Sequence, residues 1–255
     1  MEETLNLGKK KEKGKFKEKR KAFFNSLFSS PLKMILYTSL LLLSIMTLYF
    51  LCIYIFCDNF YNAWSDDSLQ YYPIMNDFIS SIKHGSFSLY SFRNYLGASF
   101  FSDVYYVPLD GFTLLIFVLS FFMKTEIAMS IVEILKMILG SAALMTYLML
   151  KGSKPKNIGL IGILYFASSG ITCFACFPSF TSLAFYLPFS LIIGYLFLKK
   201  KWWWIVPLYA LVVVFYNFYL AYTVFAFMSF MMLFMLILEK EKIKNIILKE
   251  LLFVL

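Results

Sequence analysis

The sequence is short of charge, and this shortage excludes an ordinary soluble domain. Charged side chains make up 15% of its 255 residues, whereas hydrophobic side chains make up 60%. A soluble globular domain carries about 25% charged residues. Several apolar runs reach the length of roughly 18 residues that marks a membrane-spanning helix. The composition therefore predicts an all-α polytopic membrane protein.

Other absences narrow the functional classes. The chain contains no P-loop, GxGxxG, HExxH or GxSxG motif, so nucleotide hydrolysis and hydride transfer are unsupported. It has only four cysteines. Cys173 and Cys176 have the CxxC spacing, but they lie in an apolar segment without a βαβ context, which favours buried thiols. No aromatic platform accompanies the basic residues, so no nucleic-acid partner is expected.

Positive charge is concentrated at the N-terminus. Residues 1–33 contain ten Lys or Arg and four Asp or Glu. This segment is expected to be a basic cytoplasmic tail that touches anionic lipid, because positively charged flanks stay on the cytoplasmic side. The first transmembrane helix is expected over residues 34–56, so the chain reaches the outer face near Cys57. This predicts a multi-pass protein of the cell membrane with a cytoplasmic N-terminus.

Residues 57–125 are expected to form an outer loop with interfacial or re-entrant helices. Apolar side chains recur with helical spacing between positions 69 and 82. This periodicity predicts a short amphipathic helix that lies in the outer interface and ends at Gly85. The apolar run at 108–123 has only 16 residues, so it favours a segment that stays at the outer face rather than one that crosses.

Three basic loops set the predicted topology: 151–156, 199–201 and 239–244. They share the cytoplasmic side only if the chain crosses once, at 126–150, between the outer loop and Lys151. The alternative has two crossings there and places two of these loops outside.

The rest of the chain follows from this choice. Residues 126–238 are expected to contain about five further transmembrane helices. After the first of these, the spans lie near 158–177, 178–198, 202–217 and 218–238. Residues 239–255 are expected to be a cytoplasmic loop and the start of an apolar segment that the sequence cuts short.

Two adjacent carboxylates, Asp66 and Asp67, follow the first predicted span directly. One interpretation is electrostatic capping of the helix that follows them. The other is chemical. A carboxylate beside a second carboxylate has a raised proton affinity and can accept a proton from a hydroxyl group. The pair could also bind a divalent cation, Mg²⁺ or Mn²⁺, through oxygen ligands. No other cofactor is expected.

Glu133 and Lys136 lie three residues apart within a predicted span, so they share a helix face. Ionisable side chains inside a membrane are costly and often functional. They are expected either to neutralise each other or to place Lys136 against a phosphate, with Glu133 orienting it. Further candidates for substrate binding are Arg93 and Asn94 in the outer loop, where Arg suits phosphate, and Asn217 and Tyr219 at a predicted outer turn.

The order of several short motifs resembles the YfhO family of bacterial membrane proteins. An acidic dipeptide precedes "QYYP", and "YSFRNYLGASFF", "YYVPLDGFTLLIF", "LYFASSG", "LPFSLIIG" and "NFYLAY" follow in turn. The resemblance covers about residues 40–238. It implies a GT-C-like membrane glycosyltransferase that takes a sugar from a polyprenyl-phosphate carrier and modifies a cell-wall polymer such as lipoteichoic acid in Gram-positive bacteria.

The resemblance also implies roles for particular residues. The family's essential carboxylate falls on Asp66, its Gln-Tyr pair on Gln70 and Tyr71, and its intramembrane lysine on Lys136. Two positions depart from the pattern, because Asp67 replaces an apolar residue and Ser65 replaces a glycine. Which of the two aspartates acts as the base therefore stays open.

Together these inferences predict an outer-face glycosyltransferase. Asp66 would be the general base, Asp67 would support it or bind metal, and Lys136 and Arg93 would neutralise the lipid-phosphate leaving group. Expected partners are the bilayer, the polyprenyl-phosphate-linked sugar, the cell-wall acceptor, a flippase and the glycosyltransferase that makes the donor. The alternatives are a transporter or flippase of a lipid-linked or small anionic substrate, which would use Glu133 and Lys136 at a midplane site, and a non-catalytic scaffold.

Overall fold

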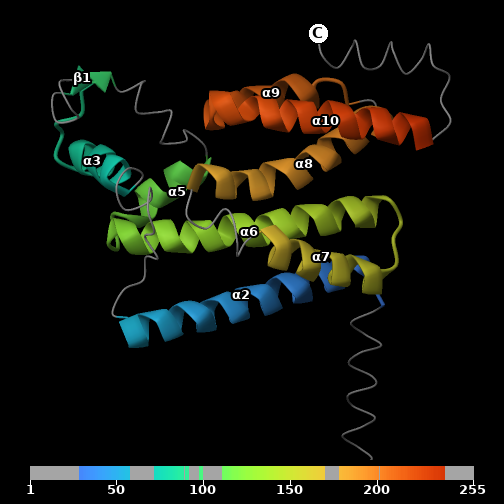
Figure 1. The fold of residues 1–255 in the computed structure, drawn as a ribbon, viewed down its shortest axis with the longest axis horizontal. Coiled ribbons are helices and arrows are strands. Elements are labelled where there is room, and N and C mark those ends of the chain that lie inside the picture. The colour runs from blue at the N-terminus through green and yellow to red at the C-terminus, as the bar shows by residue number, and fades with distance from the viewer. Residues whose placement is uncertain are drawn as a thin grey trace, which may run out of the picture.

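The protein is an all-α polytopic membrane protein with one short pair of strands. The computed structural model describes residues 29–57, 72–88, 90–91, 98–99, 111–169, 178–200 and 202–238. The elements in chain order are α2 (Pro31–Cys57), α3 (Tyr72–Lys83), β1 (Tyr90–Ser91), β2 (Ala98–Ser99), α5 (Gly111–Leu119), α6 (Thr125–Leu150), α7 (Pro155–Ser169), α8 (Pro178–Lys200), α9 (Ile205–Tyr216) and α10 (Phe218–Leu238). The long helices lie roughly side by side (Figure 1).

Among the described residues, four helices are long and apolar enough to cross a membrane. These segments are Pro31–Cys52, Thr125–Leu150, Thr181–Lys199 and Leu220–Leu238. The described part of α7 has 15 residues. Helix α9 has 12 residues, so it reaches only about 18 Å of the roughly 30 Å hydrocarbon thickness. Helix α9 ends where Asn217 adopts an extended backbone conformation.

The basic segments gather at one end of the helix bundle. In Figure 1 the first turn of α2, the turn between α6 and α7, and the last turns of α8 and α10 lie at the same end. Lys33, Lys151 and Lys199 belong to these turns. The opposite end holds the end of α2, helix α3 and strand β1. The arrangement agrees with a shared side for the first two basic loops, and the assignment of that side to the cytoplasm stays a prediction.

Helix α5 is too short to span the membrane. Its nine residues, Gly111–Leu119, reach about 13 Å. It lies near α3 at the end of the bundle opposite the basic turns (Figure 1), and it packs against the first half of α6. The topology in which residues 108–123 do not cross the membrane stays a prediction.

Helix α6 is the centre of the bundle and contacts α2, α5, α7 and α8. Its contact with α8 is close because Gly140 lacks a side chain, so the backbone of Ala184 can lie directly against it. Close approach at small residues is the usual basis of helix association in lipid, where apolar burial supplies little driving force.

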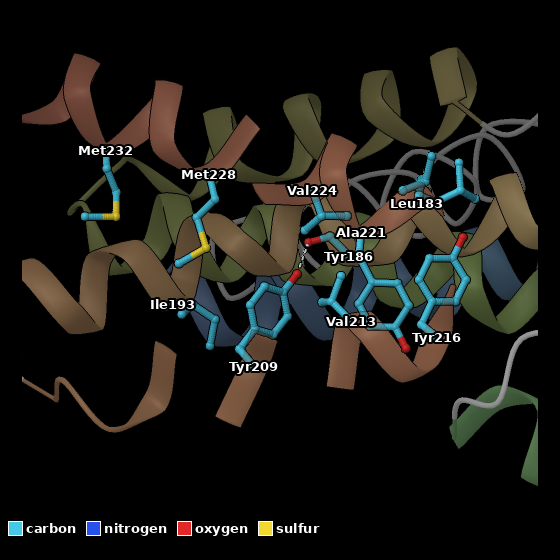
Figure 2. Close-up of a cluster of buried hydrophobic side chains, with 11 residues drawn as sticks. Leu183, Tyr186, Ile193, Tyr209, Val213, Tyr216, Ala221, Val224, Met228 and Met232 are labelled. Carbon is cyan, nitrogen blue, oxygen red and sulfur yellow. Dashed lines mark hydrogen bonds between the residues drawn. The ribbon is translucent and has the colours of Figure 1, made fainter. Parts of the chain in front are cut away.

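A cluster of buried side chains joins α8, α9 and α10 (Figure 2). Tyr186 and Tyr216 lie with their ring centroids 4.6 Å apart, and Tyr209 packs beside them. Met228 and Met232 close the cluster from α10. Helices α9 and α10 meet at Asn217 without a longer loop, so these three helices form one packed unit.

Candidate functional site

The outer end of the predicted site is only partly covered by the described residues. Asp66, Asp67, Gln70 and Tyr71 lie outside the described residues, as do Arg93 and Asn94. The elements that flank them are described. Cys57 ends α2 and Tyr72 begins α3 on either side of the aspartates, and β1 and β2 pair antiparallel on either side of Arg93 and Asn94. The roles predicted for these six residues stay predictions.

The amphipathic helix predicted from periodicity is present as α3, and Gly85 follows it with φ +64°. Its apolar face is buried against protein, because Met75 and Ile79 pack on Phe112 and Ile116 of α5 and on α6. The prediction placed this helix in the membrane interface. Periodicity identified the buried face correctly, but it could not say that other helices would cover that face.

Two polar contacts tie α3 to the rest of the bundle. The hydroxyl of Tyr72 donates to Oε1 of Glu126, in the first turn of α6, at 2.7 Å. At the other end of α3, the Lys83 ammonium donates to the Ser120 carbonyl and lies 5.4 Å from the centroid of the Phe121 ring. Burial raises the pKa of Tyr72 to about 12, with smaller contributions from the hydrogen bond to Glu126 and from its charge.

The intramembrane pair lies in the middle of α6. The Lys136 ammonium donates to Oε1 of Glu133 at 2.7 Å, and the Lys136 side chain is 2% exposed. The same ammonium lies 5.7 Å from the centroid of the Phe112 ring, within the range of a cation–π interaction. The mutual neutralisation that the spacing predicts is therefore present, while contact with a phosphate stays a prediction.

An apolar groove of about 580 Å³ lies beside this pair. It runs from Gly111 and Phe112 of α5 along α6 and α8 to Trp204 and Leu208 near the start of α9. Lys136 is not among its lining residues, and Phe112 both lines the groove and contacts the Lys136 ammonium.

The groove is open at the surface of the helix bundle. Leu139, Trp204 and Leu208 line it and are exposed. Composition did not reveal the groove, because its walls come from four helices far apart in the sequence.

A proline leaves a backbone carbonyl without its helical partner in α8. Pro188 has no N–H group, so the carbonyl of Ala184, four residues earlier, cannot accept the usual helical hydrogen bond. The hydroxyl of Tyr165 in α7 donates to this carbonyl at 2.7 Å. Two further carbonyls of α8 also accept hydroxyl groups, Tyr186 from Tyr209 and Leu187 from Ser190. A buried carbonyl left unsatisfied in lipid is costly, so the Tyr165 hydroxyl compensates for the hydrogen bond that Pro188 removes.

Asn217 serves as the cap of α10. Its side chain is 6% exposed, and its Oδ1 accepts a hydrogen bond from the backbone N–H of Leu220 at 3.0 Å. Asparagine is a favoured residue at this position of a helix, so the capping role was open to prediction from the sequence. Tyr219 belongs to the first turn of α10. Substrate binding by Asn217 and Tyr219 stays a prediction.

No group of three or more metal-binding side chains occurs within the described ranges. The Mg²⁺ or Mn²⁺ prediction rests on Asp66 and Asp67, which lie outside those ranges.

Comparison with known proteins agrees with the resemblance noted from the motifs. No curated protein and no solved structure matches the chain. The family described as "Bacterial membrane protein YfhO" matches residues 38–255. This match includes every helix described above apart from the first turns of α2, and with it the Glu133–Lys136 pair and the groove. The chain therefore belongs to the YfhO family of bacterial membrane proteins.

Proposed function

We propose that this protein is a membrane glycosyltransferase of GT-C type. It would move a sugar from a polyprenyl-phosphate carrier to a cell-wall polymer of the teichoic or lipoteichoic acid kind at the outer face of the membrane. Family membership supports a role in the bacterial membrane. The observation that carries the proposal is an apolar groove, open at the surface of the helix bundle, that ends beside a ring in contact with a buried ammonium group.

The groove and the ammonium match the two parts of a lipid phosphate. The apolar walls suit an isoprenoid chain, because ligand pockets bury an apolar body and add a few polar groups for orientation. The cation of Lys136 suits the phosphate, although the ion pair with Glu133 and the Phe112 ring now cover it. Contact with the phosphate would therefore require the Phe112 side chain to move.

The proposed reaction is a single displacement at the anomeric carbon. Asp66 accepts the proton of the acceptor hydroxyl, whose oxygen forms a bond to that carbon. The bond from the carbon to the phosphate oxygen breaks, and the polyprenyl phosphate leaves with the electron pair. Arg93 and Lys136 stabilise the charge that develops on it. Asp67 supports Asp66 or holds a divalent cation.

Transfer by the purified protein in proteoliposomes tests this proposal. The substrates are a polyprenyl-phosphate sugar and a teichoic acid acceptor, and the variants are Asp66→Asn and Asp67→Asn. Loss of a general base lowers turnover by about 10²–10⁴-fold. Asp77→Asn, on α3, is the matched control and should retain activity. Full activity in both Asp66→Asn and Asp67→Asn would show that neither carboxylate is catalytic.

A transporter or flippase is the second candidate, and Pro188 within α8 is the observation that favours it. Transporters of lipid-linked or small anionic substrates use interrupted helices at their binding sites. Helix α8 stays helical from Pro178 to Lys200, however, and its freed carbonyl is occupied by Tyr165. The same proteoliposomes separate the two functions, because a flippase moves the labelled lipid across the bilayer without forming a glycosidic bond.

A further inference from the structure

Two apolar cavities of the bundle share one wall. The groove described above, of about 580 Å³, lies between α5, α6, α8 and α9. A second cavity of about 410 Å³ lies between α9 and α10 and is lined by Val206, Ala210, Phe225, Met228 and neighbours. Tyr209 lines both cavities. Its ring packs on Phe189, which lines the first cavity, and shares a buried cluster with Met228, which lines the second.

The structure holds Tyr209 firmly in this position. The side chain is 5% exposed, and its hydroxyl donates to the Tyr186 carbonyl at 2.7 Å (Figure 2). Its ring centroid lies 5.8 Å from that of Phe189 and 6.5 Å from that of Tyr186. Moving the ring would break a hydrogen bond in an apolar environment and two aromatic contacts. These contacts hold the Tyr209 side chain in one position.

The location of the groove identifies what would fill it. Leu139, on the membrane-spanning helix α6, and Leu208, on α9, line the groove and are exposed, and hydrocarbon chains surround the apolar part of a spanning helix. Among the described residues, none of those that line the groove is charged. Water would find few hydrogen-bond partners there, so an aliphatic lipid chain is the occupant that suits these walls.

We propose that Tyr209 determines how much of an isoprenoid chain the protein accommodates. With Tyr209 in place the chain is confined to the groove, and without it the chain could continue into the second cavity. The inference rests on the proposed function, because it takes the carrier lipid as the ligand. It adds a residue that discriminates between carriers by chain length.

Binding of lipids that differ only in chain length tests this role. The purified full chain in detergent is titrated with farnesyl, geranylgeranyl and undecaprenyl phosphate, and the bound lipid is measured by native mass spectrometry. In the unsubstituted protein, affinity should stop rising once the chain fills the groove. In Tyr209→Ala, affinity should continue to rise with length. Each additional methylene that is buried contributes about 0.8 kcal/mol, or roughly fourfold in affinity.

Three further variants keep the result interpretable. Tyr209→Leu removes the ring with less loss of packing and should shift the length profile in the same direction as Tyr209→Ala. Ala210→Phe combined with Tyr209→Ala fills the second cavity and should restore the original profile. Tyr216→Phe removes a hydroxyl from the same cluster without touching either cavity, and its profile should be unchanged.

The outcomes separate the two proposals. If the lipids bind but Tyr209→Ala and Tyr209→Leu keep the original length profile, the role of Tyr209 is wrong while the proposed function stands. If Tyr216→Phe shifts the profile as much as the Tyr209 variants do, the effect is general loosening, and the role of Tyr209 is again wrong. If no polyprenyl phosphate binds the unsubstituted protein at any length, both proposals are wrong.

Discussion

Helices α2 and α6 look alike in the sequence but occupy different environments. They contain 27 and 26 residues, and both are long and apolar enough to cross a membrane. Of the apolar stretch that could cross the membrane, 17% is buried within the protein in α2 and 56% in α6. Most of α2 is therefore not covered by the described residues, while α6 forms the centre of the bundle. Apolar character places a helix in the membrane but does not say which of its neighbours it will contact.

Hydrogen bonds of hydroxyl side chains are one reason why α2 and α6 differ in burial. In α2, Ser44 donates to Leu40 and Thr47 donates to Leu43, so each hydroxyl satisfies a carbonyl of its own helix. In α6, Ser130 and Thr146 also donate to carbonyls of their own helix, but Ser141 donates to the Gly162 carbonyl of α7 at 2.8 Å. A hydrogen bond to another helix holds two elements together, whereas a bond within one helix does not.

The close contacts at glycine residues also differ between α6 and α2. A methyl group at Gly140 of α6 would overlap the backbone carbonyl of Ala184 in α8. At the contact between α2 and α7, a methyl group at Gly159 would overlap the end of the Met34 side chain. A methionine side chain can change rotamer, but a helix backbone cannot yield without moving the helix. The α6–α8 contact is therefore rigid and the α2–α7 contact is adaptable.

The largest effect is expected from breaking the polar pair that distinguishes α6. Lys136→Met removes the ammonium group that is paired with the Glu133 carboxylate in the bundle, at a cost of about 4 kcal/mol in the free energy of unfolding. Unfolding of the purified protein in detergent, followed by tryptophan fluorescence, measures this. The double variant Lys136→Met, Glu133→Gln removes both charges of the pair from α6. It should recover most of the lost free energy of unfolding. A double variant as unstable as the single one would contradict this account.

The glycine comparison is tested by a matched pair of substitutions. Gly140→Ala should destabilise the protein by about 3 kcal/mol, because the added methyl group meets backbone and packing cannot relax. Gly159→Ala should cost less than about 1 kcal/mol, because Met34 can move and alanine favours the helix by a similar amount. Both are measured by the same unfolding experiment. Equal losses at the two sites would remove the distinction between a rigid and an adaptable contact.

The hydrogen bond beside Pro188 should have a smaller effect. Tyr165→Phe removes the donor to the Ala184 carbonyl and should lower stability by about 1 kcal/mol, the usual size for one hydrogen bond between helices in a membrane. Adding Pro188→Ala supplies an N–H for that carbonyl within α8, so the loss from Tyr165→Phe should disappear in this background. A loss that persists would show that the tyrosine acts through packing.

The smallest effect is expected at the link between α3 and α6. Tyr72→Phe should cost less than about 1 kcal/mol, because the residue is partly exposed and the hydrogen bond competes with water. The raised pKa of Tyr72 makes this contribution depend on pH. It is fully present below pH 10, the ordinary pKa of tyrosine, and is lost as the pH rises through about 12.

Melting temperatures between pH 9 and pH 12 check this dependence. The difference between the unsubstituted protein and Tyr72→Phe should shrink toward zero as the pH rises. Tyr49→Phe, at an exposed position on α2, is the control and should show no such trend. A constant difference across the range would mean that Tyr72 contributes only packing.

Much of the fold was predictable from the sequence because the signals are local. Charge and apolar length predicted a polytopic helical protein, apolar periodicity predicted α3, and Gly85 marked its end with a left-handed backbone conformation. The three-residue spacing of Glu133 and Lys136 indicated an ion pair as one of two alternatives, and this ion pair is present. Each of these features depends on residues within one or two helical turns of one another, so the sequence alone carries the information.

The tertiary structure decided what depends on residues far apart in the chain. Nothing in the sequence near Pro188 indicates that Tyr165 would satisfy its freed carbonyl, and nothing near Tyr209 indicates that it would line two cavities. The burial of α6 and the exposure of α2 belong to the same class. Inside lipid all apolar faces are nearly equivalent, so close contacts at small residues and hydrogen bonds between helices select the arrangement, and these exist only once the helices have packed.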